Sequence, residues 1–169
     1  MATTTNGLGA MCSKSYAAAS SSPRARWTPE EIHQASGYGA FVRHHFCIDG
    51  SAFGLPAMEF KVMDPQQMVL LDLGTQVLGA LGMKDTGVFV GIQYQTGPHL
   101  SKVNVFSGTG AVCSVAAGRL SFVHGLIGPC LSLDTACSSS LAALHSAVSS
   151  SQNGECQFAV AAGANILDK

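Results

Sequence analysis

The residue whose type and position best suit chemistry is Cys137. It follows the apolar segment PCLSLD, lies within the small-residue run TACSSS, and precedes the helical pattern SLAALHSAV. A cysteine at a sharp strand-to-helix bend is held clear of the backbone, and small neighbours leave room for a substrate. The N–H groups and the dipole at the start of the helix favour a thiolate and can stabilise an oxyanion on an attacked thioester. The pattern therefore predicts a nucleophilic cysteine beside an oxyanion site.

The other cysteines and the histidines lack this setting, and we expect the cysteines to be packing residues. His145 follows Cys137 by eight residues on the same predicted helix, about 12 Å along its axis at about 1.5 Å per residue, too far to act as its base. His44 and His45 would point to opposite faces of a strand, which disfavours a shared metal ion. We predict no metal site, no directly bound cofactor and no phosphate-binding loop. The other cysteines are Cys12, Cys47, Cys113, Cys130 and Cys156, and the histidines without partner spacing are His33, His99 and His124.

The composition excludes several classes of protein. The formal net charge is −1 and only 11% of the residues are charged, so there is no broad basic surface of the kind that binds nucleic acid. Apolar residues make up 47% of the chain, too many for a disordered protein, yet no run reaches the roughly 18 apolar residues of a membrane span. Low charge combined with high apolarity indicates that a partner covers part of the surface.

Residues 1–25 differ from the rest of the sequence. They are rich in Ser, Thr and Ala and contain basic residues but no acidic ones. This is the composition of a disordered leader and also of an organelle transit peptide. The scattered cysteines form no C-x-x-C pair, which together with the lack of a secretory segment favours an intracellular location. We therefore expect a leader over 1–25 and a folded region over 26–169, in the cytoplasm or a plastid.

The folded region begins its regular pattern with a helix. In MDPQQMVLLDLGTQVLGALG, Asp64 is expected to cap the helix, Gln67 to complete a capping box, and Gly82 to close the helix. The apolar run GVFVGI over 87–92 predicts a strand that is buried on both faces. Residues 109–125 predict a single helix rich in Ala and Gly.

Two further strands frame the segment that holds Cys137. One ends near Asp134, and the other, QFAVAAG over 157–163, is expected to be buried. Residues 37–48 predict one or two short edge strands. Alternating strands and helices imply right-handed crossovers, so we predict an α/β fold with a mainly parallel sheet and helices on both faces. The helix after Cys137 is expected to stop at Gly154 and has apolar residues at Leu141, Leu144 and Val148.

Several motifs in this sequence resemble those of β-ketoacyl synthases. DTACSSSLAALHSA is similar to the active-site cysteine signature of that family, and MDPQQ, GVFVGI, GTGAVCSVAAGRLSF and GLIGPCLSLDTACSSS follow in the family's order and approximate spacing. The resemblance spans roughly residues 26–167. FVRHHFCIDG and AAGANIL look most like the ketosynthase domains of type I polyketide synthases, particularly those of dinoflagellate algae.

The resemblance implies a synthase of polyketide or fatty-acid type with a thiolase-like fold, of which only the N-terminal half is present, and a homodimer. It also implies decarboxylative Claisen condensation, in which the cysteine matching Cys137 takes an acyl chain from the phosphopantetheine of an acyl carrier protein. A malonyl-type extender then loses carbon dioxide and attacks the acyl-enzyme. By the same analogy, the backbone N–H of Cys137 contributes to the oxyanion hole. The implied partners are an acyl carrier protein and acyl and malonyl thioesters.

Two alternatives stay open, because family members also use two histidines and a lysine that lie beyond the matched segment. None of the six histidines in this sequence matches that pair, so we expect residues 1–169 alone to lack condensing activity. The first alternative is a noncatalytic ketosynthase-like protein that dimerises or docks a carrier protein, which the retained Cys137 disfavours. The second is a cysteine-dependent thioester hydrolase or acyltransferase, which needs a nearby histidine and an acidic partner that we do not identify here.

Overall fold

The chain divides into two compact units, residues 1–45 and 46–169. In the first unit, strand β1 (Ser20–Ser21) pairs antiparallel with strand β2 (Tyr38–Gly39). β2 lies within the predicted edge-strand segment, whose residues 40–47 fall outside the described ones. No helix in the described part of the chain is long and apolar enough to cross a membrane. The structure is a computed structural model that describes residues 20–21, 38–39, 48–79, 83–93 and 105–166.

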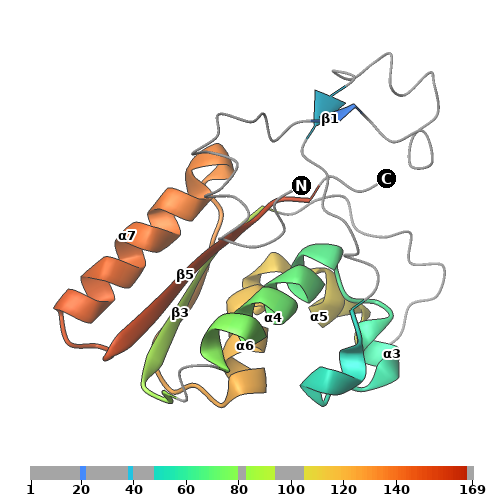
Figure 1. Cartoon of the computed structure of the whole chain (residues 1–169), viewed down its shortest axis with the longest axis horizontal. Helices are drawn as coiled ribbons and strands as arrows, with labels where there is room; N and C mark the ends of the chain where they lie inside the picture. Colours follow the sequence, from blue (N-terminus) through green and yellow to red (C-terminus); the bar gives the residue numbers. More distant parts are fainter. Residues whose placement is uncertain (1–19, 22–37, 40–47, 80–82, 94–104, 167–169) are drawn as a thin grey trace. The chain divides into compact units, whose positions relative to one another are not determined.

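Three parallel strands form the sheet of the second unit (Figure 1). Every residue of the central strand is buried, which confirms the strand predicted over 87–92. The strand predicted over 157–163 is also present, but it is only partly buried. The prediction of full burial is wrong because this strand lies at an edge of the sheet. The strands are β3 (Thr86–Ile92), β4 (Cys130–Leu133) and β5 (Phe158–Ala164), in the spatial order β4-β3-β5.

Helices cover both faces of this sheet, which confirms the predicted α/β fold class (Figure 1). Helices α4 (Pro65–Leu78) and α6 (Ala116–His124) lie on one face, and helix α7 (Ser139–Gln152) lies on the other. The side chains of β3 alternate between the two layers, as in any strand. Phe89 packs with α7, whereas the side chains that pack with α4 and α6 are Val88, Val90 and Ile92.

Helices α4 and α6 form one layer, which we call the α4/α6 layer. Apolar side chains fill it, with large ones from α4 and mostly smaller ones from α6. Two short helical turns precede α4 in the chain, η1 (Gly50–Phe53) and α3 (Ala57–Phe60). The alanines of α6 bring its backbone close to the sheet, and the leucines of both helices fill the remaining space. The buried helix residues of this layer are Leu70, Leu71, Leu78, Ala116, Ala117 and Leu120.

Helix α7 packs on the opposite face through small residues, and we call this the α7 layer. Phe89 of β3 forms a separate core cluster there with Ala143 and Ala147. The apolar residues noted in the sequence of this helix point away from the sheet. Leu141 is 70% exposed, Leu144 51% and Val148 47%. The helix ends at Gln152, and Gly154 follows in the left-handed conformation (φ 74°), as expected for a helix stop.

The helix predicted over 64–82 is present as α4, with two differences. Asp64 caps it as expected, since its carboxylate accepts a hydrogen bond from the Gln66 N–H at 2.7 Å. Gln67 does not complete a capping box, because its side chain bonds to residues more than 40 positions away. The helix ends at Leu78, with Gly79 following, and the predicted end at Gly82 lies outside the described residues.

The single helix predicted over 109–125 is wrong, because the segment is broken into three pieces. They are α5 (Ser107–Ala111), the 3-10 turn η2 (Cys113–Val115) and α6. Val112, at the break, is extended with φ −86° and ψ 119°. Its carbonyl oxygen accepts a hydrogen bond from Gln67 Nε2 at 3.2 Å. The same carbonyl oxygen accepts from the Val115 N–H at 3.2 Å, as in a 3-10 turn. A local and a tertiary hydrogen bond therefore take the place of the bond that a continuous α-helix would make to the Ala116 N–H.

Candidate active site

Cys137 lies at a tight bend between β4 and α7, as the sequence predicts. β4 ends at Leu133, Ala136–Ser138 form the 3-10 turn η3, and α7 begins at Ser139. Ala136 has a φ of 54° and is the one non-glycine residue with a positive φ in the described part of the chain. This left-handed conformation costs an alanine about 1–2 kcal/mol. Such strained residues are found at functional turns where the surrounding structure holds them in place.

Hydroxyl groups hold this bend from within. The Ser139 hydroxyl donates to the Ala136 carbonyl oxygen at 2.7 Å and accepts from the Thr135 N–H at 2.8 Å. The Ser138 hydroxyl donates to the Thr135 carbonyl oxygen at 2.8 Å. The Asp134 carboxylate accepts from the Ala136 N–H at 3.0 Å. The small polar residues of the bend therefore fix its conformation in addition to leaving space around the cysteine.

The Cys137 side chain is exposed, so a reagent can reach its thiol. It lies beyond the carboxyl end of a parallel strand, where ligands of α/β proteins bind. None of the backbone hydrogen bonds in the described part of the chain has the Cys137 N–H as its donor. The 14-residue helix α7 begins two residues later, and the N–H groups and dipole of its first turn favour negative charge. The bend therefore combines an accessible thiol with donors for an anion.

Gln66 connects the carboxyl ends of two strands, on the side of the sheet where the Cys137 bend lies. Its side chain lies at the start of α4 and the residue is only 1% exposed. Gln66 Nε2 donates to the carbonyl oxygen of Gln93, the residue after β3, at 3.2 Å. Gln66 Oε1 accepts from the N–H of Ile166, just after β5, at 3.3 Å. One buried amide therefore connects the carboxyl ends of β3 and β5.

Cys113, in the η2 turn, lies near the carboxyl ends of the strands, but its surroundings differ from those of Cys137. The η2 turn packs on β4, since the Ser132 hydroxyl donates to the Ser114 carbonyl oxygen at 3.3 Å. Partial burial raises the pKa of the Cys113 thiol, and the carboxylates of Asp64 and Asp134 raise that pKa further. Cys113 is therefore held as a neutral thiol, which suits a packing residue better than a nucleophile.

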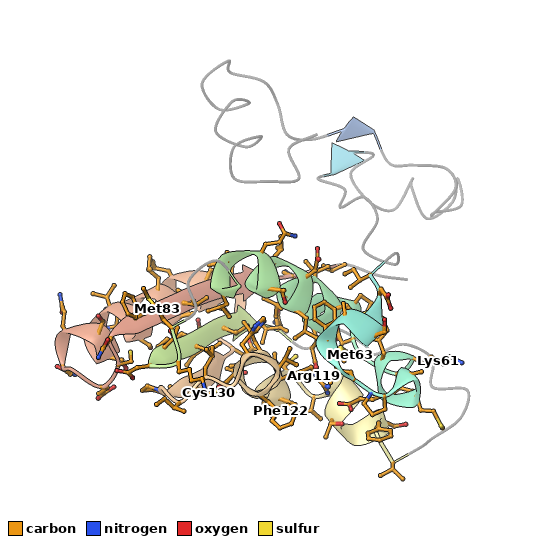
Figure 2. All side chains as sticks on the ribbon, turned by 60° about the horizontal axis from the view of Figure 1, so that its bottom comes forward. Lys61, Met63, Met83, Arg119, Phe122 and Cys130 are labelled. Carbon is orange, nitrogen blue, oxygen red and sulfur yellow. The ribbon has the colours of Figure 1, made fainter. Side chains whose placement is uncertain are left out.

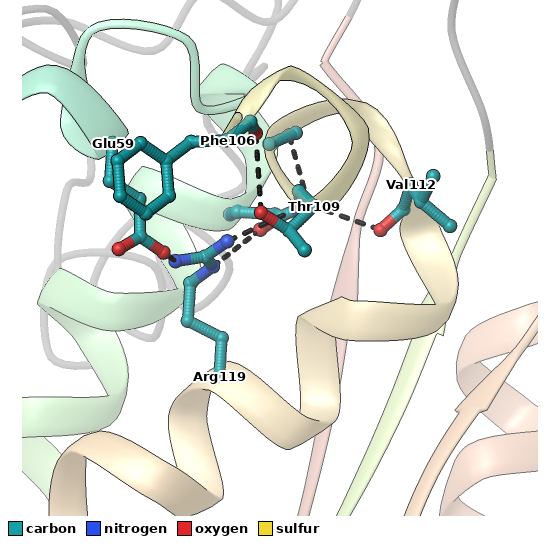
Figure 3. Close-up of polar contacts among 7 residues, drawn as sticks. Glu59, Phe106, Thr109, Val112 and Arg119 are labelled. Atoms are coloured by element: carbon teal, nitrogen blue, oxygen red, sulfur yellow. Dashed lines mark hydrogen bonds and ion pairs between the residues drawn. The ribbon is translucent and has the colours of Figure 1, made fainter. Parts of the chain in front are cut away.

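A buried polar cluster holds the segment that leads into η2 (Figure 3). Arg119 of α6 is 6% exposed and forms an ion pair with Glu59 of α3. Arg119 also donates to Gln67 Oε1 at 2.8 Å and to the Thr109 carbonyl oxygen at 3.2 Å. Gln67 Nε2 in turn donates to the Gly110 carbonyl oxygen at 3.1 Å. These five residues, the Arg119 cluster, tie α3, α4, α5 and α6 together.

The structure places the remaining predicted residues away from the bend or does not describe them. His145 is exposed on α7, and His124 is the last residue of α6. Cys156 is buried as predicted, whereas Cys130 is exposed because β4 is an edge strand, so its predicted packing role is wrong. In the described part of the chain, no group of three His, Cys, Asp or Glu could hold a metal ion. The residues outside the described ones are Cys12, Cys47, His33, His44, His45 and His99.

The fold and the bend define the class of this protein, an α/β protein of thiolase-like fold. Its structure is similar to the ketosynthase from module 6 of the bacillaene synthase of Bacillus subtilis 168, with a TM-score of 0.80 at 24% identity. That similarity covers 97% of this chain and 29% of the other. It is also similar to the oxazolomycin ketosynthase domain OzmH KS7 of Streptomyces albus JA3453, with a TM-score of 0.77 at 26% identity over 97% of this chain and 32% of the other.

The sequence comparison identifies the family. The family described as "Beta-ketoacyl synthase, N-terminal domain" matches residues 10–168. The chain therefore belongs to the β-ketoacyl synthase family and contains its N-terminal domain, of the kind found in type I polyketide synthases.

The relatives of this chain are much longer proteins. The phenolphthiocerol synthesis polyketide synthase type I Pks15/1 of Mycobacterium marinum is 40% identical over 139 residues, which cover 77% of this chain and 7% of the relative. The mycoketide-CoA synthase of Mycobacterium tuberculosis is 42% identical over 137 residues, 76% of this chain and 3% of the relative. This chain thus spans less than a tenth of these two relatives and about a third of the solved ketosynthase chains.

Sequence reasoning missed the roles of Gln66, Gln67, Arg119 and Glu59. A signal for one of them was present, because Arg119 is the one charged residue in the otherwise uncharged segment 107–124. A lone arginine among small and apolar residues requires a buried acidic or amide partner. The identity of that partner depends on the fold, since Glu59 precedes Arg119 by 60 residues.

Proposed function

We propose that this chain is part of a β-ketoacyl synthase of a type I polyketide synthase and that Cys137 accepts the acyl chain. The observation that carries the proposal is the tight, hydrogen-bonded bend that presents the exposed Cys137 thiol at the start of α7. Family membership supports the class of reaction. The proposed substrates are acyl and malonyl-type thioesters on the phosphopantetheine of an acyl carrier protein, which is the proposed partner.

In the first step, the Cys137 thiolate attacks the carbonyl carbon of the acyl thioester. A carbon–sulfur bond to Cys137 forms, and the carbonyl oxygen becomes an oxyanion. Collapse of this adduct breaks the bond to the phosphopantetheine sulfur, which leaves as a thiolate and takes up a proton. We place the oxyanion at the Cys137 backbone N–H, because a donor that is already oriented stabilises developing charge without reorganisation.

In the second step, the malonyl-type extender loses its carboxylate as carbon dioxide, and the electron pair stays on the α-carbon. This carbanion attacks the acyl carbonyl carbon, a carbon–carbon bond forms, and Cys137 leaves as a thiolate. The resemblance assigns the decarboxylation to two histidines that no histidine of this sequence matches. We therefore propose that a polypeptide of residues 1–169 completes the first step and not the second.

Mass spectrometry of the acylated polypeptide tests this proposal. Residues 1–169 incubated with an acyl thioester of phosphopantetheine should gain one acyl group on the peptide that contains Cys137, and Cys137→Ala should gain none. Cys130→Ala is the matched control, because Cys130 is also exposed but lies at the amino end of β4, the strand that leads into the Cys137 bend. This control should be acylated like the wild type.

Three results would contradict the proposal. Equal acylation of the wild type and Cys137→Ala would remove Cys137 as the nucleophile. Steady release of free acid that depends on Cys137 would instead favour a thioester hydrolase. Formation of a β-ketoacyl product from a malonyl-type extender would show that residues 1–169 complete the second step.

We also propose that the complete protein is a homodimer. Large apolar side chains are exposed near the edge strand β4, where Leu131 is 42% exposed. On α6, Arg119 points into the protein while Phe122, 81% exposed, points outward (Figure 2). Such apolar surface favours contact with another protein. Light scattering should give twice the mass of the chain, and a monomer at micromolar concentration would contradict the proposal.

The sequence also supports two narrower proposals, one on the kind of ketosynthase and one on the location of the protein. The motifs FVRHHFCIDG and AAGANIL support a dinoflagellate-type ketosynthase, while the two relatives described above are bacterial. We propose an intracellular location, in the cytoplasm or a plastid, with residues 1–25 as a leader to the domain over 26–169, and the family match begins within this leader, at residue 10. A fluorescent protein fused to residues 1–25 should enter plastids if the leader is a transit peptide and stay in the cytoplasm if it is not.

A further inference from the structure

Two glycines lie directly beneath the first turn of α7. Gly91 in β3 and Gly163 in β5 are register partners in the parallel pair. A methyl group on Gly91 would lie 2.5 Å from the Ser139 carbonyl oxygen and 2.6 Å from the Ser140 backbone nitrogen. A methyl group on Gly163 would overlap the Ser140 hydroxyl oxygen and lie 2.9 Å from Ser140 Cβ. The backbone of α7 therefore leaves no room for a side chain at Gly91, and the Ser140 side chain occupies the space that one at Gly163 would need.

Helix α7 contacts β3 differently at Phe89 and at Gly91. Phe89 and Gly91 point to the same face of β3, because side chains two residues apart share a face. At Phe89 a large side chain separates the strand from Ala143 and Ala147 of α7. At Gly91 the backbone of the strand meets the backbone of Ser139 with no side chain between them. The turn that follows Cys137 thus rests on β3 by direct backbone contact.

Ser139 transmits this contact to the bend. Its backbone rests on Gly91, and its hydroxyl accepts from the Thr135 N–H and donates to the Ala136 carbonyl oxygen. Thr135 and Ala136 are the two residues that precede Cys137. The position of Ser139 on the strand therefore sets the position of the two residues that lead into the cysteine. The side-chain amide of Gln66 connects the ends of β3 and β5 just beyond the two glycines.

We propose that Gly91 and Gly163 are positioning residues that set the depth of the first turn of α7 and, through Ser139, the placement of the Cys137 thiol and N–H. Their importance for acyl transfer rests on the proposed function. We call Gly91, Gly163 and the Ser139–Ser140 turn above them the seat. The close contacts within the seat can be tested without reference to the proposed function.

Four variants test the seat. Gly91→Ala meets backbone atoms that must move by roughly 1 Å to reach the ordinary contact distance of 3.4 Å. Gly163→Ala meets mainly the Ser140 side chain, so Gly163→Ala/Ser140→Gly should relieve the overlap, leaving Ser140 Cα at 3.6 Å. Gly118→Ala is the matched control, since a methyl group on Gly118 in α6 would have no atom within 4 Å.

The first readout is amide hydrogen exchange of Thr135, Ala136 and Ser138, whose N–H groups are hydrogen-bonded within the bend. Exchange should accelerate in Gly91→Ala and less so in Gly163→Ala. It should return to the wild-type rate in Gly163→Ala/Ser140→Gly and stay unchanged in Gly118→Ala. The rescue by the double variant keeps the test valid even where Gly91→Ala fails to fold, because general unfolding is not reversed by removing one side chain above the seat.

The second readout is the rate of acylation of Cys137 by the acyl thioester, divided by its rate of alkylation by iodoacetamide. Alkylation needs the thiol but no oxyanion site. A displacement of about 1 Å costs a positioned reaction roughly 100-fold, so the ratio should fall by roughly that factor in Gly91→Ala. The ratio should fall less in Gly163→Ala and recover in the double variant.

The outcomes separate this inference from the proposed function. A wild-type chain that is not acylated contradicts the proposed function, while hydrogen exchange still decides whether the seat exists. Unchanged exchange in both glycine variants overturns the seat. Changed exchange with an unchanged acylation ratio in an acylated wild type overturns its positioning role. Faster exchange together with a lower acylation ratio in the glycine variants, and recovery of both in the double variant, supports the inference.

Discussion

The two layers on the sheet are built from different kinds of side chains. The α4/α6 layer has a core of large buried side chains: Leu71 and Leu120 are each 1% exposed, and the Arg119 cluster ties its elements together. The α7 layer rests on alanines and two glycines, and leaves Leu144 half-exposed on its outer side. The first layer derives its stability from packing within the chain. The second brings a helix start close to the sheet, where the reactive bend is.

This difference indicates a division of labour between the layers. Large side chains stabilise a layer but keep the backbones of helix and sheet apart, whereas glycines allow close approach and contribute little apolar burial. Substitutions in the α4/α6 layer should therefore change the free energy of unfolding most. Substitutions beneath α7 should change the geometry of the Cys137 bend. The following predictions test the first half of this comparison, from the largest effect to the smallest.

Arg119→Met should destabilise the α4/α6 layer most. It removes the partner of the largely buried Glu59 carboxylate and leaves Gln67 Oε1 without its donor. Breaking a buried ion pair by removing one partner costs about 3–5 kcal/mol. Urea denaturation should show this as a lower midpoint. Lys61→Met, at an exposed lysine at the end of α3, should stay within about 0.5 kcal/mol of the wild type, and equal midpoints for the two variants would show that the cluster contributes no stability.

The same substitution in the two layers gives the most direct comparison. Leu71→Ala in α4 removes a side chain from a residue that is 1% exposed, which should cost about 2–5 kcal/mol. Leu144→Ala in α7 truncates a residue that is 51% exposed, which should change the free energy of unfolding by no more than about 0.5 kcal/mol. Urea denaturation of both variants measures the difference. A cost for Leu144→Ala as large as that for Leu71→Ala would show that the outer face of α7 is covered in solution.

His124 should give the α4/α6 layer a small pH dependence. The Thr75 hydroxyl donates to the Leu71 carbonyl oxygen at 2.8 Å, so the Thr75 oxygen accepts from Nε2–H of His124 at 3.1 Å. Burial lowers the pKa of His124 below its ordinary value of 6.5. The unfolded chain therefore binds this proton more tightly, and the stabilisation present above about pH 6.5 is lost as the pH falls through the lower folded pKa.

His124→Gln keeps an N–H donor and removes the titration. The free energy of unfolding of the wild type should fall more than that of this variant between pH 7.5 and pH 5.5, by less than about 1 kcal/mol because the imidazole is only partly buried. The same pH dependence in both proteins would exclude His124 as the titrating group.

The sequence alone determined the features that depend on local pattern. The buried strand β3, the helix α7 and the bend at Cys137 follow from runs of apolar residues, from small residues at a turn and from a glycine stop. The parallel sheet with helices on both faces followed from their order along the chain. These signals are local because periodicity and turn preference act over a few residues.

Only the tertiary structure decided which distant groups meet. At the break, the Val112 carbonyl oxygen accepts from the side-chain amide of Gln67, 45 residues earlier, and a helical pattern cannot show which remote amide will bond there. The placement of Gly91 beneath Ser139 depends on strand pairing and on how α7 crosses the sheet. Hydrogen bonds and close contacts between distant residues are set by packing, and packing is determined only when all the elements have come together.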